Sequence, residues 1–289
     1  MLPVNKYYLC SNRSIISVEG SDKLNFLQGM VSNNLEDLKE KKSIYCAHLT
    51  PQGKFLYDFF IFDNKKNFFL ECLSISAEEI INRFSLFKLR ANVNFEIQND
   101  YVSLLIGVDT IKKIEHKLIE KLVLFKDPRN TNFFVKIYCR RSVFEQMKKE
   151  LSLCKLSHSE FDRIRIENVI PNSEKDFKKN KMLLLEARFD KLNGISWTKG
   201  CYIGQEVTAI TNYRGKLKKQ IYGVKIHGKN LSNDVFMSSK NVGVLTSRCD
   251  NFGIAILNIK ETEDSISSKV KFTCGNGYLE PFTPKWSLR

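Results

Sequence analysis

The chain is built from short apolar runs, which limits it to folds made of many brief strands and helices. The longest runs, such as Phe59–Phe62 and Met182–Leu185, are far shorter than the ~20 residues that span a bilayer. With 43% hydrophobic residues over 289 positions, the sequence can bury a sizeable core, which excludes an intrinsically disordered chain. A chain of this length is expected to form about two domains, or a few small ones that share a core.

Strand and helix patterns alternate through the first part of the chain, which favours an α+β class. Helices are expected to begin near Ser21, Ser76, Asp109 and Ser142, with a capping box at Ser76. The segment 161–167 fits either a strand or a helix, and we favour a helix. Strands are predicted at 14–19, 43–49, 54–62, 67–73, 93–97, 101–107, 121–125 and 132–138.

Repeated short alternating runs dominate the last part of the chain. They lie at 220–226, 241–246, 253–259 and 269–273 and are separated by turn residues. This pattern predicts an all-β module, expected to be a small barrel. The sheet-then-helix units that precede it suggest a ferredoxin-like α+β sandwich in the middle of the chain.

The chain is basic, with 46 Lys and Arg against 32 Asp and Glu and a formal net charge of +14. Such a balance favours anionic partners, including nucleic acid and polyanionic cofactors. Two features favour an ordinary solvated surface instead. The sequence is rich in Lys, Asn, Ile and Phe, as A/T-rich genomes encode, and its basic residues are scattered in pairs such as Lys41-Lys42. Because RRM-type and KH-type motifs are missing, an RNA-binding module is only an alternative.

The cysteines are scattered, and none form the C-x-x-C pairs of zinc or redox sites. The segment Met1–Arg13 lacks the pattern of a secretory signal. We therefore expect mostly buried, reduced thiols in the cytoplasm. The eight are Cys10, Cys46, Cys72, Cys139, Cys154, Cys201, Cys249 and Cys274.

One segment, Lys199–Glu206 with the sequence KGCYIGQE, has the residue types of a reactive site. Two glycines flank Cys201, and a helix is predicted to begin near Gly204. A helix N-terminus and the neighbouring Lys199 would both favour the thiolate of Cys201 over the thiol. The alternative is a glycine-permitted turn that contains a buried, inert cysteine. Walker A, Gly-x-Gly-x-x-Gly and Gly-x-Ser-x-Gly motifs are absent.

This segment resembles the signature of the YgfZ family. These are folate-binding proteins of iron–sulfur cluster assembly and repair, related to the glycine-cleavage T-protein, an aminomethyltransferase. The resemblance covers nearly the whole chain. Further similar segments, in the family's order, are Phe26–Gly29, Pro51–Lys54, Arg165–Glu167, Leu185–Gly194, Tyr213–Gly215 and Asn241–Ser247.

The resemblance implies three lobes in a ring around a central hole that binds tetrahydrofolate or a one-carbon derivative of it. The first lobe would be discontinuous, residues 1–50 plus 140–215, and would carry the signature. The second would be the ferredoxin-like lobe at 51–139, and the third the β-barrel at 216–289.

The resemblance also implies roles for single residues. Cys201 matches the functional cysteine, Lys199 belongs to its surroundings, and Asp58 falls near the catalytic aspartate of the T-protein. Asp58 could equally be a charge on an edge strand. The family's usual Arg and His are replaced by Ile210 and Asn212, which weakens the case for a polyanion site there.

Folate contacts are implied for a second set of residues. Glu167 would accept hydrogen bonds from the amino group and ring N–H of the pterin, a two-donor edge that suits a carboxylate. The alternatives are a surface salt bridge from Glu167 to Arg163 or Arg165, and a helix-capping role for Arg214. The cofactor-binding candidates are Arg165, Glu167, Gln205, Glu206, Tyr213 and Arg214.

The implied function is assembly or repair of iron–sulfur clusters in client enzymes, including tRNA-modifying ones, through Cys201. No resident metal site is predicted, but Cys201 could be a transient iron ligand. A lone cysteine cannot hold a four-thiolate cluster, so assembly proteins or client enzymes are the expected partners, with no membrane. A folate-dependent aminomethyltransferase stays an alternative because of Asp58, and a direct RNA-binding module is the second alternative.

Overall fold

The computed structural model describes residues 2–215 and 217–288, which divide into two compact units. Unit 1 consists of Met1–Leu49, Leu56–His158 and Asn193–Ile203. Unit 2 consists of Thr50–Phe55, Ser159–Leu192 and Gly204–Arg289. The three predicted lobes divide the chain at other positions, and that division stays a prediction.

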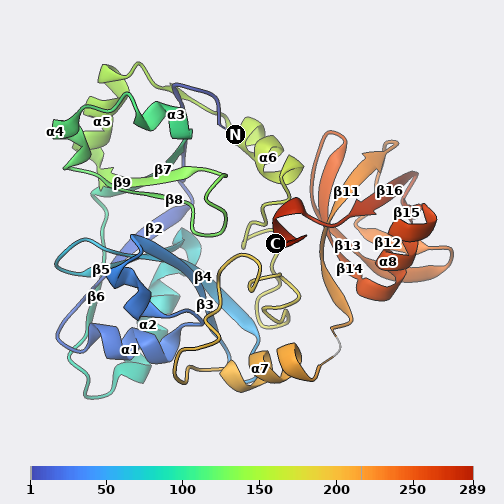
Figure 1. The fold of residues 1–289 in the computed structure, drawn as a ribbon, viewed down its shortest axis with the longest axis horizontal. Helices are drawn as coiled ribbons and strands as arrows, with labels where there is room; N and C mark the ends of the chain where they lie inside the picture. The colour runs from blue at the N-terminus through green and yellow to red at the C-terminus, as the bar shows by residue number, and fades with distance from the viewer. Residues whose placement is uncertain (1, 216, 289) are drawn as a thin grey trace. The chain divides into compact units, whose positions relative to one another are not determined.

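Unit 1 contains two five-stranded sheets (Figure 1), with strand orders β3-β4-β5-β2-β6 and β10-β1-β7-β9-β8. The first sheet consists of β2 (Arg13–Glu19), β3 (Ser43–Leu49), β4 (Phe55–Asp63), β5 (Phe68–Leu73) and β6 (Asn94–Ile97). The second consists of β1 (Lys6–Leu9), β7 (Tyr101–Ile106), β8 (Val123–Lys126), β9 (Val135–Arg140) and β10 (Cys154–Lys155). All eight strands predicted before residue 140 are present, whereas β1 and β10 were not predicted.

The side chains of β4 show how unit 1 is layered. Phe59 and Ile61 pack into a core with α1 (Lys23–Met30) and α2 (Ala77–Lys88) on one face of the first sheet. Phe62 points to the opposite face and stacks on Tyr138 of the second sheet, with ring centroids 4.2 Å apart. The far face of the second sheet packs against α5 (Arg141–Glu150). β4 is therefore buried on both faces, which explains its apolar run Phe59–Phe62.

Three predicted helices of unit 1 differ from the structure in detail. α1 begins after Asp22 rather than Ser21. The Asp22 carboxylate does not cap the helix and instead accepts a hydrogen bond from the Asn92 amide, 2.7 Å away. α2 begins as predicted, but the Ser76 side chain makes no capping bond, so the capping box is not formed. The helix expected from Asp109 to residue 119 is two short helices, α3 (Val108–Ile111) and α4 (His116–Ile119). The extended backbone of Glu115 interrupts it.

Unit 2 contains a closed six-stranded barrel of order β11-β14-β13-β12-β15-β16, which confirms the predicted C-terminal barrel. A helix that was not predicted, α8 (Ile259–Ser268), connects β14 to β15. Its buried residues include Thr262 and Ser265, so no apolar periodicity marks it in the sequence. The strands are β11 (Lys219–His227), β12 (Asp234–Met237), β13 (Lys240–Cys249), β14 (Phe252–Asn258), β15 (Phe272–Cys274) and β16 (Gly277–Phe282).

Two further helices carry most of the predicted folate residues. α6 (His158–Glu167) confirms the preference for helix over strand at 161–167, and α7 (Gln205–Tyr213) begins where the signature predicts a helix. Within the described ranges, every helix is too short or too polar to cross a membrane.

The core of unit 1 holds a neutral histidine. His48 is fully buried, and its Nδ1 lies 2.7 Å from the Met30 carbonyl oxygen. Its Nε2 accepts a hydrogen bond from Nε of Arg83 at 2.9 Å, so the proton of the neutral ring is on Nδ1. Burial lowers the pKa of His48 to about 4.

This histidine predicts a pH dependence of stability. Between pH 6.5 and about 4, the unfolded chain binds a proton on His48 that the folded chain excludes. The free energy of unfolding is therefore highest above pH 6.5 and decreases as the pH falls through this window. His48 contributes up to about 3 kcal/mol to this decrease. Urea unfolding at pH 7 and pH 4.5 should show a smaller loss in His48→Gln than in wild type. The exposed His116→Gln is the control, and equal losses in wild type and His48→Gln would contradict the assignment.

Candidate functional site around Cys201

The cysteines differ in exposure, and Cys201 is one of two that are exposed. Cys154 is the other, and Cys249 is partly exposed. The remaining five are buried, and burial raises the pKa of Cys10 to about 11 and that of Cys72 to about 12. Because a buried thiol resists ionisation, the reactive candidates narrow to the exposed pair.

Hydrogen bonds hold the Cys201 segment (residues 193–203) to the last turn of α1 and to the loop that follows it. The Ser196 amide donates to the Ser32 carbonyl at 3.0 Å, and the Ile203 amide donates to the Gly29 carbonyl at 3.1 Å. These bonds lie on both sides of the cysteine, so its thiol is exposed on an anchored backbone.

Lys199 strengthens this attachment from inside unit 1. Its ammonium donates to the carbonyl oxygens of Gln28, Val31 and Asn33, at 2.6, 2.7 and 2.9 Å. Only 8% of Lys199 is exposed, and burial lowers its pKa to about 8. All three N–H donors are engaged, so these contacts favour positioning of the loop over the predicted activation of Cys201.

Asp58 lies in a buried ion network between the two sheets of unit 1. Its carboxylate accepts hydrogen bonds from Nη1 of Arg13 and from the Tyr45 hydroxyl, both at 3.2 Å. Arg13 also pairs with Glu71, which pairs with Lys136 at 2.7 Å. Burial alone would raise the pKa of Glu71, but Lys136 and Arg13 lower it to about 2. Because β4 is an interior strand, the alternative of a charge on an edge strand was wrong.

Arg165 is the centre of a second buried network, in unit 2. Its guanidinium donates to Asp162 at 2.9 Å, Asp176 at 2.8 Å, Ser247 at 3.0 Å and the Ile170 carbonyl at 2.9 Å. Only 2% of Arg165 is exposed, and these bonds engage four of its five N–H donors. This arrangement favours a structural role that fixes α6 to the barrel over the predicted folate contact.

Glu167, at the end of α6, forms the salt bridge that was predicted as its alternative. Its Oε1 accepts from Nε of Arg163 at 3.0 Å, and the same Nε lies 3.4 Å from Asp250. The side chains of Arg163 and Glu167 are 61% and 38% exposed. An exposed pair of this kind contributes little to stability because solvent screens it, so the Glu167 carboxylate is accessible to a competing ligand.

The remaining candidates lie on α7. Gly204, which has a φ of 81°, precedes the helix in the left-handed conformation that glycine adopts most readily. Gln205 and Glu206 form the first turn, and Tyr213, at the other end, is 71% exposed. The Arg214 amide closes the helix by donating to the Ile210 carbonyl at 2.8 Å.

The candidates are thus divided between the two units. Cys201, Lys199 and Asp58 lie in unit 1, whereas Arg165, Glu167 and the α7 residues lie in unit 2. Across residues 2–215 and 217–288, no group of three or more His, Cys, Asp or Glu side chains could hold a metal ion. Any metal bound through Cys201 would therefore need ligands from elsewhere.

The chain is similar to proteins named as iron–sulfur cluster assembly factors and to one named as a tRNA-modifying protein. Residues 218–288 match the family model "CAF17, C-terminal beta-barrel domain". An iron-sulfur cluster assembly factor IBA57 homolog, mitochondrial, of Coccidioides immitis is 27% identical over 236 residues, which cover 75% of this chain and 56% of that protein. The tRNA-modifying protein YgfZ of Hamiltonella defensa is 29% identical over 232 residues, which cover 74% and 68%.

The fold is similar to that of a solved structure of another protein. The aminomethyltransferase T of the glycine cleavage system from Bartonella henselae superposes with a TM-score of 0.80 over 98% of this chain and 86% of that protein. At 12% identity this shows a T-protein-like fold alone. These comparisons confirm the predicted resemblance to the YgfZ family and the predicted T-protein-like fold. The chain spans between about half and two-thirds of the length of the first curated relatives, 56%, 54% and 63%.

The Lys199 contacts predict a large effect of removing its charge. Lys199→Met should lower the free energy of unfolding by about 2–4 kcal/mol, because three carbonyl oxygens lose their donor. Urea denaturation monitored by circular dichroism would measure this loss. The control Lys42→Met removes an exposed lysine of the same unit and should cost less than about 0.5 kcal/mol. Equal stabilities of the two variants would contradict the anchoring role.

Proposed function

We propose that this chain is a folate-binding factor for the assembly or repair of iron–sulfur clusters in client enzymes, including tRNA-modifying ones. The observation that carries the proposal is an exposed Cys201 on an anchored segment with the KGCYIGQE signature. Relatives are known as an iron–sulfur cluster assembly factor and as a tRNA-modifying protein, which supports the same role.

The chemistry of one thiol limits what the protein does alone. A thiolate is a ligand for iron and a nucleophile toward sulfur species, but a [4Fe–4S] cluster takes four such ligands. Cys201 would therefore supply one ligand during assembly while a partner supplies the others. Iron–sulfur assembly proteins and client enzymes are the partners that this requirement favours.

Folate is the proposed cofactor, and two features of unit 2 bear on its fit. Glu167 offers an accessible carboxylate on α6, which suits the amino and ring N–H donors of a pterin. Arg165 fits less well, because its donors are engaged inside the unit. When bound, a tetrahydrofolate would supply one-carbon carrier chemistry. Gln205, Glu206 and Tyr213 on α7 and Arg214 just after it stay candidates for contacts to it.

The aminomethyltransferase alternative loses its main support. It depended on Asp58 as a catalytic group, but that carboxylate is 5% exposed and bonded to Arg13 and Tyr45. A carboxylate held in this way stabilises the core of unit 1. The RNA-binding alternative depends only on the net charge of +14.

The proposed compartment is based on the redox state of the cysteines. Free cysteines at all eight positions suit a reducing environment, and we keep the cytoplasm as the proposed location. Several relatives are named as mitochondrial proteins.

A complementation assay tests the proposed function. In cells that lack their own factor of this type, the wild-type chain should restore the activity of an iron–sulfur enzyme. Cys201→Ser should restore roughly a tenth of that activity or less, because an alcohol replaces the thiolate ligand. Cys154→Ser, at the other exposed cysteine, should act like wild type. Full activity of Cys201→Ser would refute the proposed role.

A thermal-shift titration with tetrahydrofolate tests the cofactor. At ~100 times its dissociation constant, the ligand should stabilise the wild type by roughly 2.7 kcal/mol. Glu167→Ala should lose this stabilisation, whereas Cys201→Ala should keep it because the thiol has another task. Glu174→Ala, another exposed carboxylate of unit 2, is the control. An unshifted wild type would remove folate from the proposal.

A further inference from the structure

The most exposed apolar side chains of the described residues gather on one helix of unit 1. Ile75 is 88% exposed, Leu89 is 86% exposed and Leu86 is 79% exposed, the three highest values among the large apolar side chains. Ile75 lies in the short helix η2 (Ser74–Ser76) directly before α2, Leu86 lies near the end of α2, and Leu89 follows its last residue. Exposed apolar residues are ordinarily scattered singly, so this grouping indicates a contact surface.

These side chains belong to a regular stripe along α2, which we call the α2 stripe. Its residues follow one another at steps of four, three, four and three positions, and all of them are exposed. They are Ile75, Glu79, Asn82, Leu86 and Leu89. Because a helix turns once per 3.6 residues, this spacing places them on one face. The opposite face holds Ile80 and Phe84, which are buried in the core of unit 1.

The backbone at the end of α2 shows that Leu89 contributes little to the fold of unit 1. Its φ is 46°, in a region that glycine adopts readily and that leucine disfavours. Burial of the side chain would offset this strain, but the side chain is exposed. Strained residues of this kind are enriched at functional positions, which supports a role for Leu89 in a contact.

A second copy of the chain fits the α2 stripe when its own α2 runs in the opposite direction. Glu79 lies four residues after Ile75, and Asn82 lies four residues before Leu86. A two-fold axis that places Ile75 opposite Leu86 of the second copy therefore also places Glu79 opposite Asn82. The Glu79 carboxylate is hydrogen-bonded to Tyr57 of its own chain, and its other lone pairs suit the N–H donors of the Asn82 amide. Apolar residues meet apolar ones, and a donor meets an acceptor.

The charges of α2 favour the same antiparallel arrangement. Glu78 and Glu79 occupy the first turn of the helix. The following segment 80–95 contains no carboxylate and three cations, which are Arg83, Lys88 and Arg90. An antiparallel pair brings the acidic start of one helix near the basic end of the other and also opposes the two helix dipoles. A parallel pair would instead bring like charges together, with the two Glu79 carboxylates face to face.

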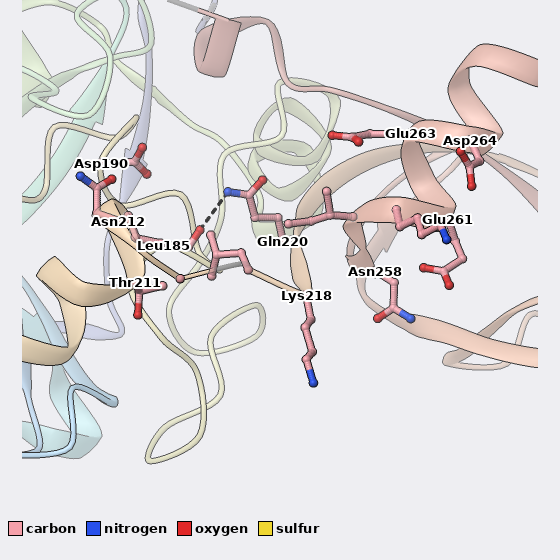
Figure 2. Close-up of a pocket in the computed structure, with 14 residues that line it drawn as sticks. Leu185, Asp190, Thr211, Asn212, Lys218, Gln220, Asn258, Glu261, Glu263 and Asp264 are labelled. Carbon is pink, nitrogen blue, oxygen red and sulfur yellow. Dashed lines mark hydrogen bonds between the residues drawn. The ribbon is translucent and has the colours of Figure 1, made fainter.

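Other surfaces and occupants fit less well. The pocket of unit 2 that Figure 2 shows is lined by none of the exposed large apolar side chains of the described residues. A lipid surface would accept the apolar ends of the α2 stripe, but it would offer no matched partners to Glu79 and Asn82 at its centre. A second copy supplies a partner for both.

We propose that the α2 stripe is a two-fold interface between two copies of this chain, packed with their α2 helices antiparallel. Leu89, one turn beyond Leu86, would extend the apolar contact at each end. Because one short helix of each copy contributes, we expect a weak and reversible dimer rather than a permanent one. The proposal does not depend on the thiol or folate roles.

Sedimentation equilibrium of the full chain in reducing buffer tests the interface. Between ~5 and ~500 µM, the average mass of the wild type should rise from that of one chain toward that of two. Leu86→Glu should weaken association roughly tenfold or more, because it places a charge in an apolar contact. Leu288→Glu is the matched control, since Leu288 is a leucine of unit 2 that is 73% exposed, and it should associate like wild type.

Leu89→Gly separates association from folding. Glycine suits the φ of 46°, so the variant should unfold at the wild-type temperature or above it. It should nevertheless associate more weakly than wild type, because the apolar side chain is lost.

Disulfide cross-linking tests the direction of the two helices. The background carries Cys154→Ser and Cys201→Ser, which remove the exposed thiols, and oxidised glutathione is the oxidant. A mixture of Ile75→Cys and Leu86→Cys chains should cross-link roughly tenfold faster than either variant alone, because only the mixture places two thiols opposite each other.

Three outcomes would overturn the proposal. They are a single-chain mass for the wild type at all concentrations, equal association of Leu86→Glu and wild type, and equal cross-linking rates in the mixture and in the separate variants.

Discussion

A single buried ammonium group links the functional signature to the fold of unit 1. Lys199 donates to three carbonyl oxygens of the turn that ends α1, and it does so with only 8% of its surface exposed. Burying a charged group lowers stability unless its donors form hydrogen bonds. Lys199 therefore needs the carbonyl oxygens of this turn, and those oxygens need the donors of Lys199. Because Lys199 stands two residues before Cys201, this contact determines where the thiol lies. The rest of the Cys201 segment follows through its backbone bonds to Ser32 and Gly29.

Both units depend on the same principle. In each, buried charged side chains form ion pairs and hydrogen bonds with other groups of the protein. In unit 1, Arg13, Asp58, Glu71 and Lys136 form a network between two sheets. In unit 2, Arg165 joins α6 to Asp176 and to Ser247 of the barrel. Breaking such networks leaves uncompensated charges, so they hold their elements in one arrangement. Glu167 lies outside such networks, so its carboxylate stays accessible to a ligand.

Much of the fold followed from the sequence, because strands and barrels carry a local pattern. The run through β4, the alternation in β11 and the helix at α7 were all readable from periodicity and turn residues. Helix α8 was not, since its buried face is Thr and Ser. The exposure of Cys201 agreed with its predicted role. The partners of Lys199 and Arg165 could not be foreseen, because some of them lie far away in the sequence. Asn33 lies 166 positions from Lys199, and Ser247 lies 82 positions from Arg165. Glu71 and Lys136 did carry a signal, as charges that lie between apolar residues of their strands.

Amide hydrogen exchange of the Cys201 segment tests the central claim, that Lys199 anchors this segment. The informative amides are those of Ser196 and Ile203, whose acceptors are the carbonyl oxygens of Ser32 and Gly29. In wild type these amides should be protected. In Lys199→Met they should exchange roughly a hundredfold faster or more, while the amides of the barrel keep their wild-type rates. Unchanged protection of both amides in Lys199→Met would contradict the account.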